Sequence, residues 1–128
     1  MLDSVAGIAL AVSGLGILHR RRPLPGLLLL AAAALWFLGG AGLPLAHRGP
    51  LTHALLGYPG ARLTTVTQRL VVVVVYAAAL GDLFAPSGAG TMICGLAVLA
   101  VAAYRIRSSH GIDRLARRTA LLCLALMW

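Results

Sequence analysis

The sequence contains no lysine and no glutamate, and all of its formal charge comes from eleven arginines and three aspartates. Charged residues make up 11% of the 128 positions, whereas a soluble domain carries about 25% because it must cover its surface with them. Hydrophobic residues make up 60%, and the mean hydropathy is +0.93. So little charge excludes an ordinary water-soluble domain, and we expect an integral membrane protein.

Groups that carry catalysis or bind metals are equally scarce. Asp3, Asp82 and Asp113 lie far apart, so no pair of carboxylates is available for acid–base chemistry. Cys94 and Cys123 stand singly inside apolar runs, and the chain has no CxxC, GxxxxGK[ST] or GxGxxG pattern. We therefore expect no catalytic residue, no cofactor and no metal ion in this chain. Whether the complete protein is an enzyme stays open.

The net charge of +8 lies in short arginine clusters between the apolar runs. In a membrane protein such clusters are typical of cytoplasmic loops and of contacts with anionic headgroups. We therefore expect membrane lipids as partners and no nucleic acid. Arginine without lysine, beside abundant Ala, Gly, Leu and Val, indicates a high-GC genome such as that of an actinobacterium.

The apolar runs predict an all-α fold, a polytopic integral membrane helical bundle that forms a single transmembrane domain. Irregular backbone or an open sheet edge that faces lipid would leave backbone amides without hydrogen-bond partners, so we exclude folds with either feature. We expect four spans and a truncated or interfacial fifth helix. The spans cover about residues 3–18, 24–46, 66–84 and 89–104, and the partial helix covers 114–128.

The last apolar stretch, residues 119–128, would be about 15 Å long as a helix, which is half the hydrocarbon thickness. It either lies along the interface or begins a span of a longer protein, and we favour the longer protein. Small residues such as Gly14 and Gly16 suit close helix packing. We expect a homodimer formed through such packing, or assembly into a larger membrane complex.

The arginines also predict an orientation. Residues 20–22 hold three arginines, residues 47–69 hold three, residues 85–90 hold none, and residues 105–118 hold five. If these four connections alternate across the membrane, one side carries eight arginines and the other three. The positive-inside rule then places the second and fourth connections, and the N-terminus, on the cytoplasmic side of a bacterial cytoplasmic membrane.

The segment HRGPLTHALLGYPGARL, residues 47–63, differs from the rest of the chain in its density of polar residues, prolines and glycines. We expect a loop that lies against the membrane, turned at Gly49-Pro50 and broken again at residues 57–60. An amphipathic ring and a snorkelling guanidinium suit the headgroup layer, which favours that position for Tyr58 and Arg62. The candidate sensing or signal-relay residues in this segment are His47, Arg48, His53, Tyr58 and Arg62.

Asp82 is a further candidate because it lies near the far end of the third predicted span. An ionisable residue inside a span is a functional hypothesis by default, and Asp82 would then sense a ligand or a proton from the outer side. The alternative is that Asp82 already lies in the outer headgroup layer, beside Pro86 and Ser87.

The segment resembles the pattern HRGPLxHxLLxYPxGRL in the N-terminal membrane regions of actinobacterial two-component sensor histidine kinases. The matching positions are His47, Arg48, Gly49, Pro50, Leu51, His53, Leu55, Leu56, Tyr58, Pro59, Arg62 and Leu63. Gly60-Ala61 stands where the family more often has a small residue and then glycine. The resemblance extends to RLVVVVVYAAAL and RLARRTALLCLAL, and so covers the middle and end of the chain.

This resemblance implies a sensor or input module that relays an envelope or membrane signal to a cytoplasmic kinase. Such kinases continue into a dimerising helix pair with the phospho-accepting histidine and an ATP-binding α/β sandwich. Neither part is present in these 128 residues, so this chain does not phosphorylate anything by itself. The alternative is a small accessory subunit, or a stand-alone integral membrane protein, packed against a larger membrane complex.

Overall fold

The computed structural model describes residues 2–42, 45–81, 88–107 and 111–127, and the regular secondary structure among them is helical, with no strand. The prediction of an all-α fold is confirmed for them. The helices are α1 (Leu2–His19), α2 (Pro23–Phe37), a 3-10 turn η1 (Leu38–Ala41), α3 (Arg48–Leu56), α4 (Val66–Gly81), α5 (Gly88–Arg107) and α6 (Ile112–Met127).

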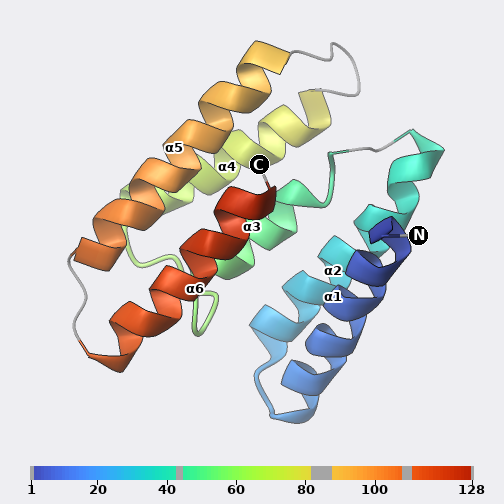
Figure 1. Cartoon of the computed structure of the whole chain (residues 1–128), viewed down its shortest axis with the longest axis horizontal. Coiled ribbons are helices and arrows are strands. Elements are labelled where there is room, and N and C mark those ends of the chain that lie inside the picture. Colours follow the sequence, from blue (N-terminus) through green and yellow to red (C-terminus); the bar gives the residue numbers. More distant parts are fainter. Residues whose placement is uncertain (1, 43–44, 82–87, 108–110, 128) are drawn as a thin grey trace.

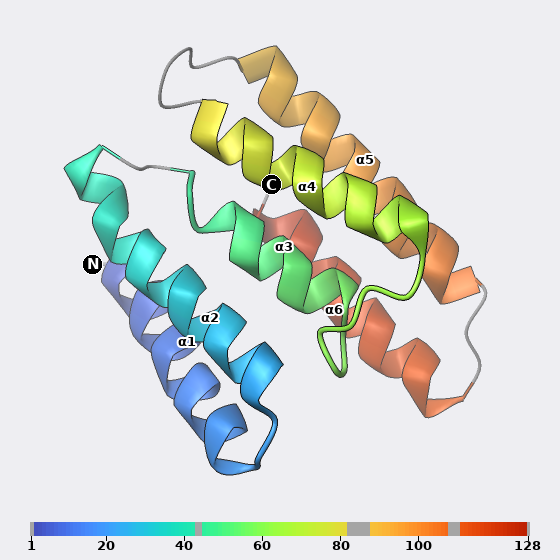
Figure 2. The ribbon, with the colours of Figure 1, turned by 180° about the vertical axis from the view of Figure 1, so that it is seen from behind.

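The helices run roughly along one common direction, each antiparallel to the one before it (Figure 1). The short helix α3 lies between the α1–α2 pair and the α4–α5 pair, and α6 overlaps α3 in both views (Figures 1 and 2). Packing follows the same order, since α2 contacts α3, and α3 in turn contacts α4 and α6. The segment expected to be a loop on the membrane therefore contains a helix inside the bundle.

The interior is built from small and branched side chains, and many larger apolar side chains face outward. Val75 and Val98 are 1% and 0% exposed and form the core with Leu56, Val72 and Ala102. On the outer faces of α1, α2, α4 and α5, large apolar side chains are more than half exposed. Examples are Val5, Ile8, Val12, Leu15, Leu27, Phe37, Val73, Val74, Leu80, Met92, Ile93 and Leu96.

Helices α1 and α2 approach closely at Gly14 and Gly26. A Cβ at Gly14 would lie 3.0 Å from the Gly26 carbonyl oxygen, and a Cβ at Gly26 would lie 2.9 Å from that of Gly14. Helices that meet through small residues gain backbone contact that larger side chains prevent. Gly14 thus packs as expected. Gly16 does not, because a Cβ there would have no atom within 4 Å.

The second helix is shorter than the expected span over residues 24–46. The α-helix ends at Phe37, η1 continues to Ala41, and Gly42 follows in the left-handed region with φ 98°. Three glycines within residues 39–42 explain the ending, since glycine is among the poorest helix formers. Among the described helices, α5 alone is long and apolar enough to cross a membrane, whereas α1, α2 and α4 have apolar stretches of 15 or 16 residues.

The helix α3 changes how the arginines are distributed. It adds one crossing of the bundle between α2 and α4, so the α1–α2 and α3–α4 connections lie at the same end, together with the C-terminal end of α5 and the N-terminal end of α6 (Figures 1 and 2). Nine of the eleven arginines belong to these segments, and Arg69 lies in the adjoining first turn of α4; Arg48 at the start of α3 is the exception. The expectation that residues 20–22 lie opposite the later arginines is wrong.

Candidate functional site

The start of α3 is held against α2 by aromatic contact. The ring centroids of Trp36 and His47 are 4.3 Å apart, with the planes tilted by 55°. His47 and Arg48 are both half-buried there. His47 therefore connects the start of α3 to the α1–α2 pair, and Arg48 follows it at the end of α3 that lies away from the other arginines.

The middle of α3 packs on α4 through Tyr76. The His53 and Tyr76 ring centroids lie 6.5 Å apart with the planes nearly perpendicular, and the Tyr76 ring fills the space over Gly49, where a Cβ would lie 2.6 Å from it.

The connection from α3 to α4 is a tight structure rather than an open loop. Gly57 and Ala61 are buried, and Ala61 adopts the left-handed region with φ 55°. A Cβ at Gly57 would lie 2.5 Å from the carbonyl carbon of Ala61. Tyr58 and Arg62 stand at the surface of this connection, and the Tyr58–Pro59 peptide bond is cis.

Gln68 ties this connection to the first turn of α4. Its side chain is fully buried, and its Oε1 accepts hydrogen bonds from the backbone N–H groups of Thr64 (2.9 Å) and Thr65 (3.1 Å). In return, Thr65 Oγ1 accepts from the Gln68 N–H at 3.3 Å, which is the reciprocal arrangement of a capping box. Gln68 Nε2 donates to the Leu56 carbonyl, twelve residues earlier, at 3.2 Å.

The Leu56 carbonyl joins two further helices. Arg105 Nη1, near the C-terminal end of α5, also donates to this oxygen. Arg117 Nη1 on α6 donates to the Arg105 carbonyl at 3.4 Å. We call Leu56, Gln68, Arg105 and Arg117 the polar hub, because they link the ends of α3, α4, α5 and α6 at the arginine-rich end of the bundle.

The sequence prediction did not single out Gln68, Arg105 or Arg117. For Gln68 a sequence pattern was available, since Thr65-x-x-Gln68 is the spacing of a capping box before an apolar run. The other contacts of the hub join positions up to 49 residues apart. No local pattern indicates such a pairing.

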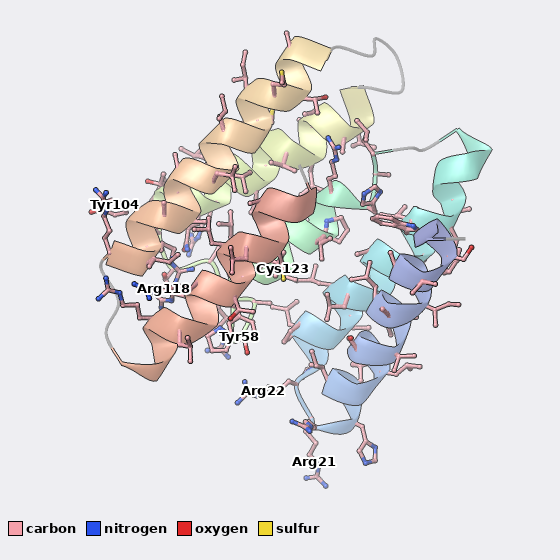
Figure 3. All side chains as sticks on the ribbon, viewed as in Figure 1. Arg21, Arg22, Tyr58, Tyr104, Arg118 and Cys123 are labelled. Carbon is pink, nitrogen blue, oxygen red and sulfur yellow. The ribbon has the colours of Figure 1, made fainter. Side chains whose placement is uncertain are left out.

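Two adjoining cavities lie between the α1–α2 connection and the α3–α4 connection. The first, of about 550 Å³, is lined by Ile17, Arg20, Arg22, Pro25, Leu29, Ala54, Leu55, Tyr58 and Pro59. The second, of about 530 Å³, shares Arg22, Pro25 and Pro59 with it and adds Arg62. We call the two together the arginine groove. Arg21, Arg22 and Tyr58 appear near this end of the bundle in Figure 3.

The structure thus divides the predicted residues into separate groups. Tyr58 and Arg62 line the arginine groove, His53 packs on Tyr76, and His47 and Arg48 lie at the far end of α3. Nine helical residues separate the two ends by about 13 Å, so these residues do not form one site. Asp82 lies outside the described residues.

Comparisons with known proteins found no match to a family model, a curated protein or a solved structure. Within the described residues, no group of three or more His, Cys, Asp or Glu side chains lies close enough to hold a metal ion.

Proposed function

We propose that this chain is a membrane-embedded input module of a bacterial sensor histidine kinase. In this proposal α1, α2, α4 and α5 cross the cytoplasmic membrane, and α3 fills the interior between them. A signal from the envelope or the membrane shifts these helices, and the polar hub passes the shift to a cytoplasmic kinase.

The observation that carries the membrane placement is the distribution of side chains over the surface. Large apolar side chains such as Ile8, Leu27 and Val73 are 55–63% exposed along the helices, whereas the arginines gather at the helix ends. A water-soluble bundle hides its large apolar residues, and exposed apolar surface of this extent marks contact with lipid or protein. In a membrane, small residues pack between the helices and large apolar residues face outward. Lipid tails are as apolar as leucine, so this exposure carries no cost there.

The arginine distribution supports one orientation. With ten arginines at one end of the bundle, the positive-inside rule favours that end for the cytoplasm. The α1–α2 and α3–α4 connections would then be cytoplasmic, and the N-terminal end of α1 would lie outside. The sequence alone had favoured a cytoplasmic N-terminus, because residues 47–69 were counted as one connection without the helix α3.

Cysteine labelling separates the two orientations. In a background with Cys94→Ala and Cys123→Ala, we expect Ser4→Cys to react with a membrane-impermeant thiol reagent in whole cells. Arg21→Cys and Gly60→Cys should react in inverted vesicles alone. All three positions are exposed, so unequal labelling would reflect the side of the membrane.

The opposite pattern at Ser4 and Arg21 would restore the cytoplasmic N-terminus. Labelling of all three positions from both sides would contradict the membrane placement.

The polar hub supports the relay role. It joins α3, α4, α5 and α6 through side-chain bonds to backbone carbonyls, so displacement of one helix end is transmitted to the other three. Coupling of this kind needs a structural element whose position the signal changes. Here that element is α3, whose start contacts α2 through Trp36 and His47 and whose last residue is Leu56.

The rival function is an accessory subunit of a larger membrane complex, which the same outward apolar surface would also suit. An antibody against residues 57–63, used on native membranes, separates the two roles. A polypeptide much larger than the 13.2 kDa of this chain that incorporates phosphate from ATP on histidine supports the sensor kinase. A band of about 13.2 kDa that co-purifies with a larger membrane complex, without phosphorylation, would support the accessory subunit instead.

A further inference from the structure

We propose that the arginine groove binds one anionic phospholipid from the inner leaflet, and this inference rests on the membrane placement proposed above. The phosphate would lie between Arg20 and Arg22 of the α1–α2 connection and Arg62 of the α3–α4 connection. An acyl chain would follow the apolar wall toward the middle of the bundle.

The groove has two chemically different parts. Ile17, Leu29, Ala54 and Leu55 form an apolar wall contributed by three helices, α1, α2 and α3. Arginines form the mouth, together with Tyr58, whose side chain is 42% exposed. A small soluble anion would occupy the mouth and leave the apolar wall in water. A phospholipid covers both parts, and burial of apolar surface favours that occupant.

Charge and size agree with this occupant. No acidic side chain is among the described residues that line the two cavities, so the arginine charges are not neutralised from within the groove. A volume of about 550 Å³ lies within the range of small-molecule sites, about 300–1,000 Å³. Basic pockets between membrane helices on the cytoplasmic side are suited to phosphate headgroups.

Binding also has a structural consequence. The groove is bounded by two segments far apart in the sequence, residues 20–25 and 54–62. A bound headgroup would hold the α1–α2 pair against the connection that leads to the polar hub. The anionic lipid content of the membrane would then bias the position of α3, which makes lipid composition an input to the proposed relay.

The experiment measures binding of phosphatidylglycerol to the purified protein in maltoside micelles by native mass spectrometry, with phosphatidylcholine as the neutral reference. The double variant Arg20→Gln/Arg22→Gln changes the groove. The matched control Arg107→Gln/Arg118→Gln removes the same charge from exposed residues that line neither cavity. Ile17→Trp, which fills the apolar wall and keeps every arginine, separates shape from charge.

We expect the groove double variant to weaken phosphatidylglycerol binding about twentyfold, since each arginine near an anionic surface contributes about fivefold. The matched control should change binding by less than about twofold, and Ile17→Trp should weaken it with all charges retained. Millimolar glycerol phosphate should not displace the lipid.

Equal weakening in both double variants would overturn the site in favour of general charge attraction. Displacement by glycerol phosphate would overturn the lipid in favour of a soluble anion. Because the measurement uses micelles, its failure leaves the labelling test of orientation unaffected.

Discussion

Replacement of Gly57 by alanine is expected to destabilise the protein by about 2–3 kcal/mol, the upper part of the range for overpacking a filled site. The new Cβ would lie 2.5 Å from the carbonyl carbon and 2.6 Å from the Cα of Ala61. Both are backbone atoms, so no rotamer change relieves the contact. Ala61 is 1% exposed and already in the left-handed region, which leaves the connection little room to shift. SDS titration followed by Trp fluorescence gives the free energy of unfolding.

Gly60→Ala is the matched control, in the same connection. A Cβ at Gly60 would have no atom within 4 Å, so we expect a change within about 0.5 kcal/mol. Comparable losses in the two variants would show that the connection tolerates no added methyl group anywhere. An unchanged Gly57→Ala protein would show that the connection opens without cost, and would remove the tight α3–α4 joint from the proposed relay.

The positions of the longer helices could be predicted from hydropathy, and the helix α3 could not. Apolar runs of 15 to 20 residues are helical whichever neighbours they have, because their backbone groups must bond internally. Residues 48–56 carry Gly49, Pro50, Thr52 and His53 in nine positions, a composition that favours a turn. The helix forms because Tyr76 fills the space over Gly49 and because Leu56 enters the core, and both contacts are tertiary.

This one short helix also explains why the proposed orientation differs from the one expected from the sequence. The sequence-based count treated residues 47–69 as a single connection, so the arginine clusters alternated between two sides. With α3 as an additional crossing, the first cluster joins the later ones at one end. The positive-inside rule is the same in both cases. Its result depends on whether residues 48–56 are counted as part of a loop or as the helix α3.

The candidate site was predictable in its surface residues alone. Tyr58 and Arg62 line the arginine groove, where a headgroup contact was expected from their chemistry. Their partners Arg20 and Arg22 lie more than 30 residues earlier, and no local spacing connects them. Ala61 was not singled out either, and its φ of 55° is a conformation that glycine adopts without steric cost.

Gln68→Met should produce the other large effect, a loss of about 3 kcal/mol, because buried polar groups left without partners cost about 1–3 kcal/mol each. Methionine has a similar length but lacks the acceptor for the Thr64 and Thr65 N–H groups, and the Leu56 carbonyl would keep Arg105 as its one donor. Gln68 itself is fully buried, so water does not take the place of its amide without opening the structure. The same SDS titration measures the loss, and circular dichroism shows whether the helices persist.

Arg69→Met provides the control, since it introduces the same side chain one position later. It removes an exposed bond from Arg69 Nε to the Leu63 carbonyl, and exposed substitutions of this kind change stability by about 0.5 kcal/mol or less. A large loss in Gln68→Met with little loss in Arg69→Met would identify the buried amide as the group that joins α3 to α4. Similar losses would mean that the first turn of α4 is sensitive as a whole, and Gln68 would then lose its place in the polar hub.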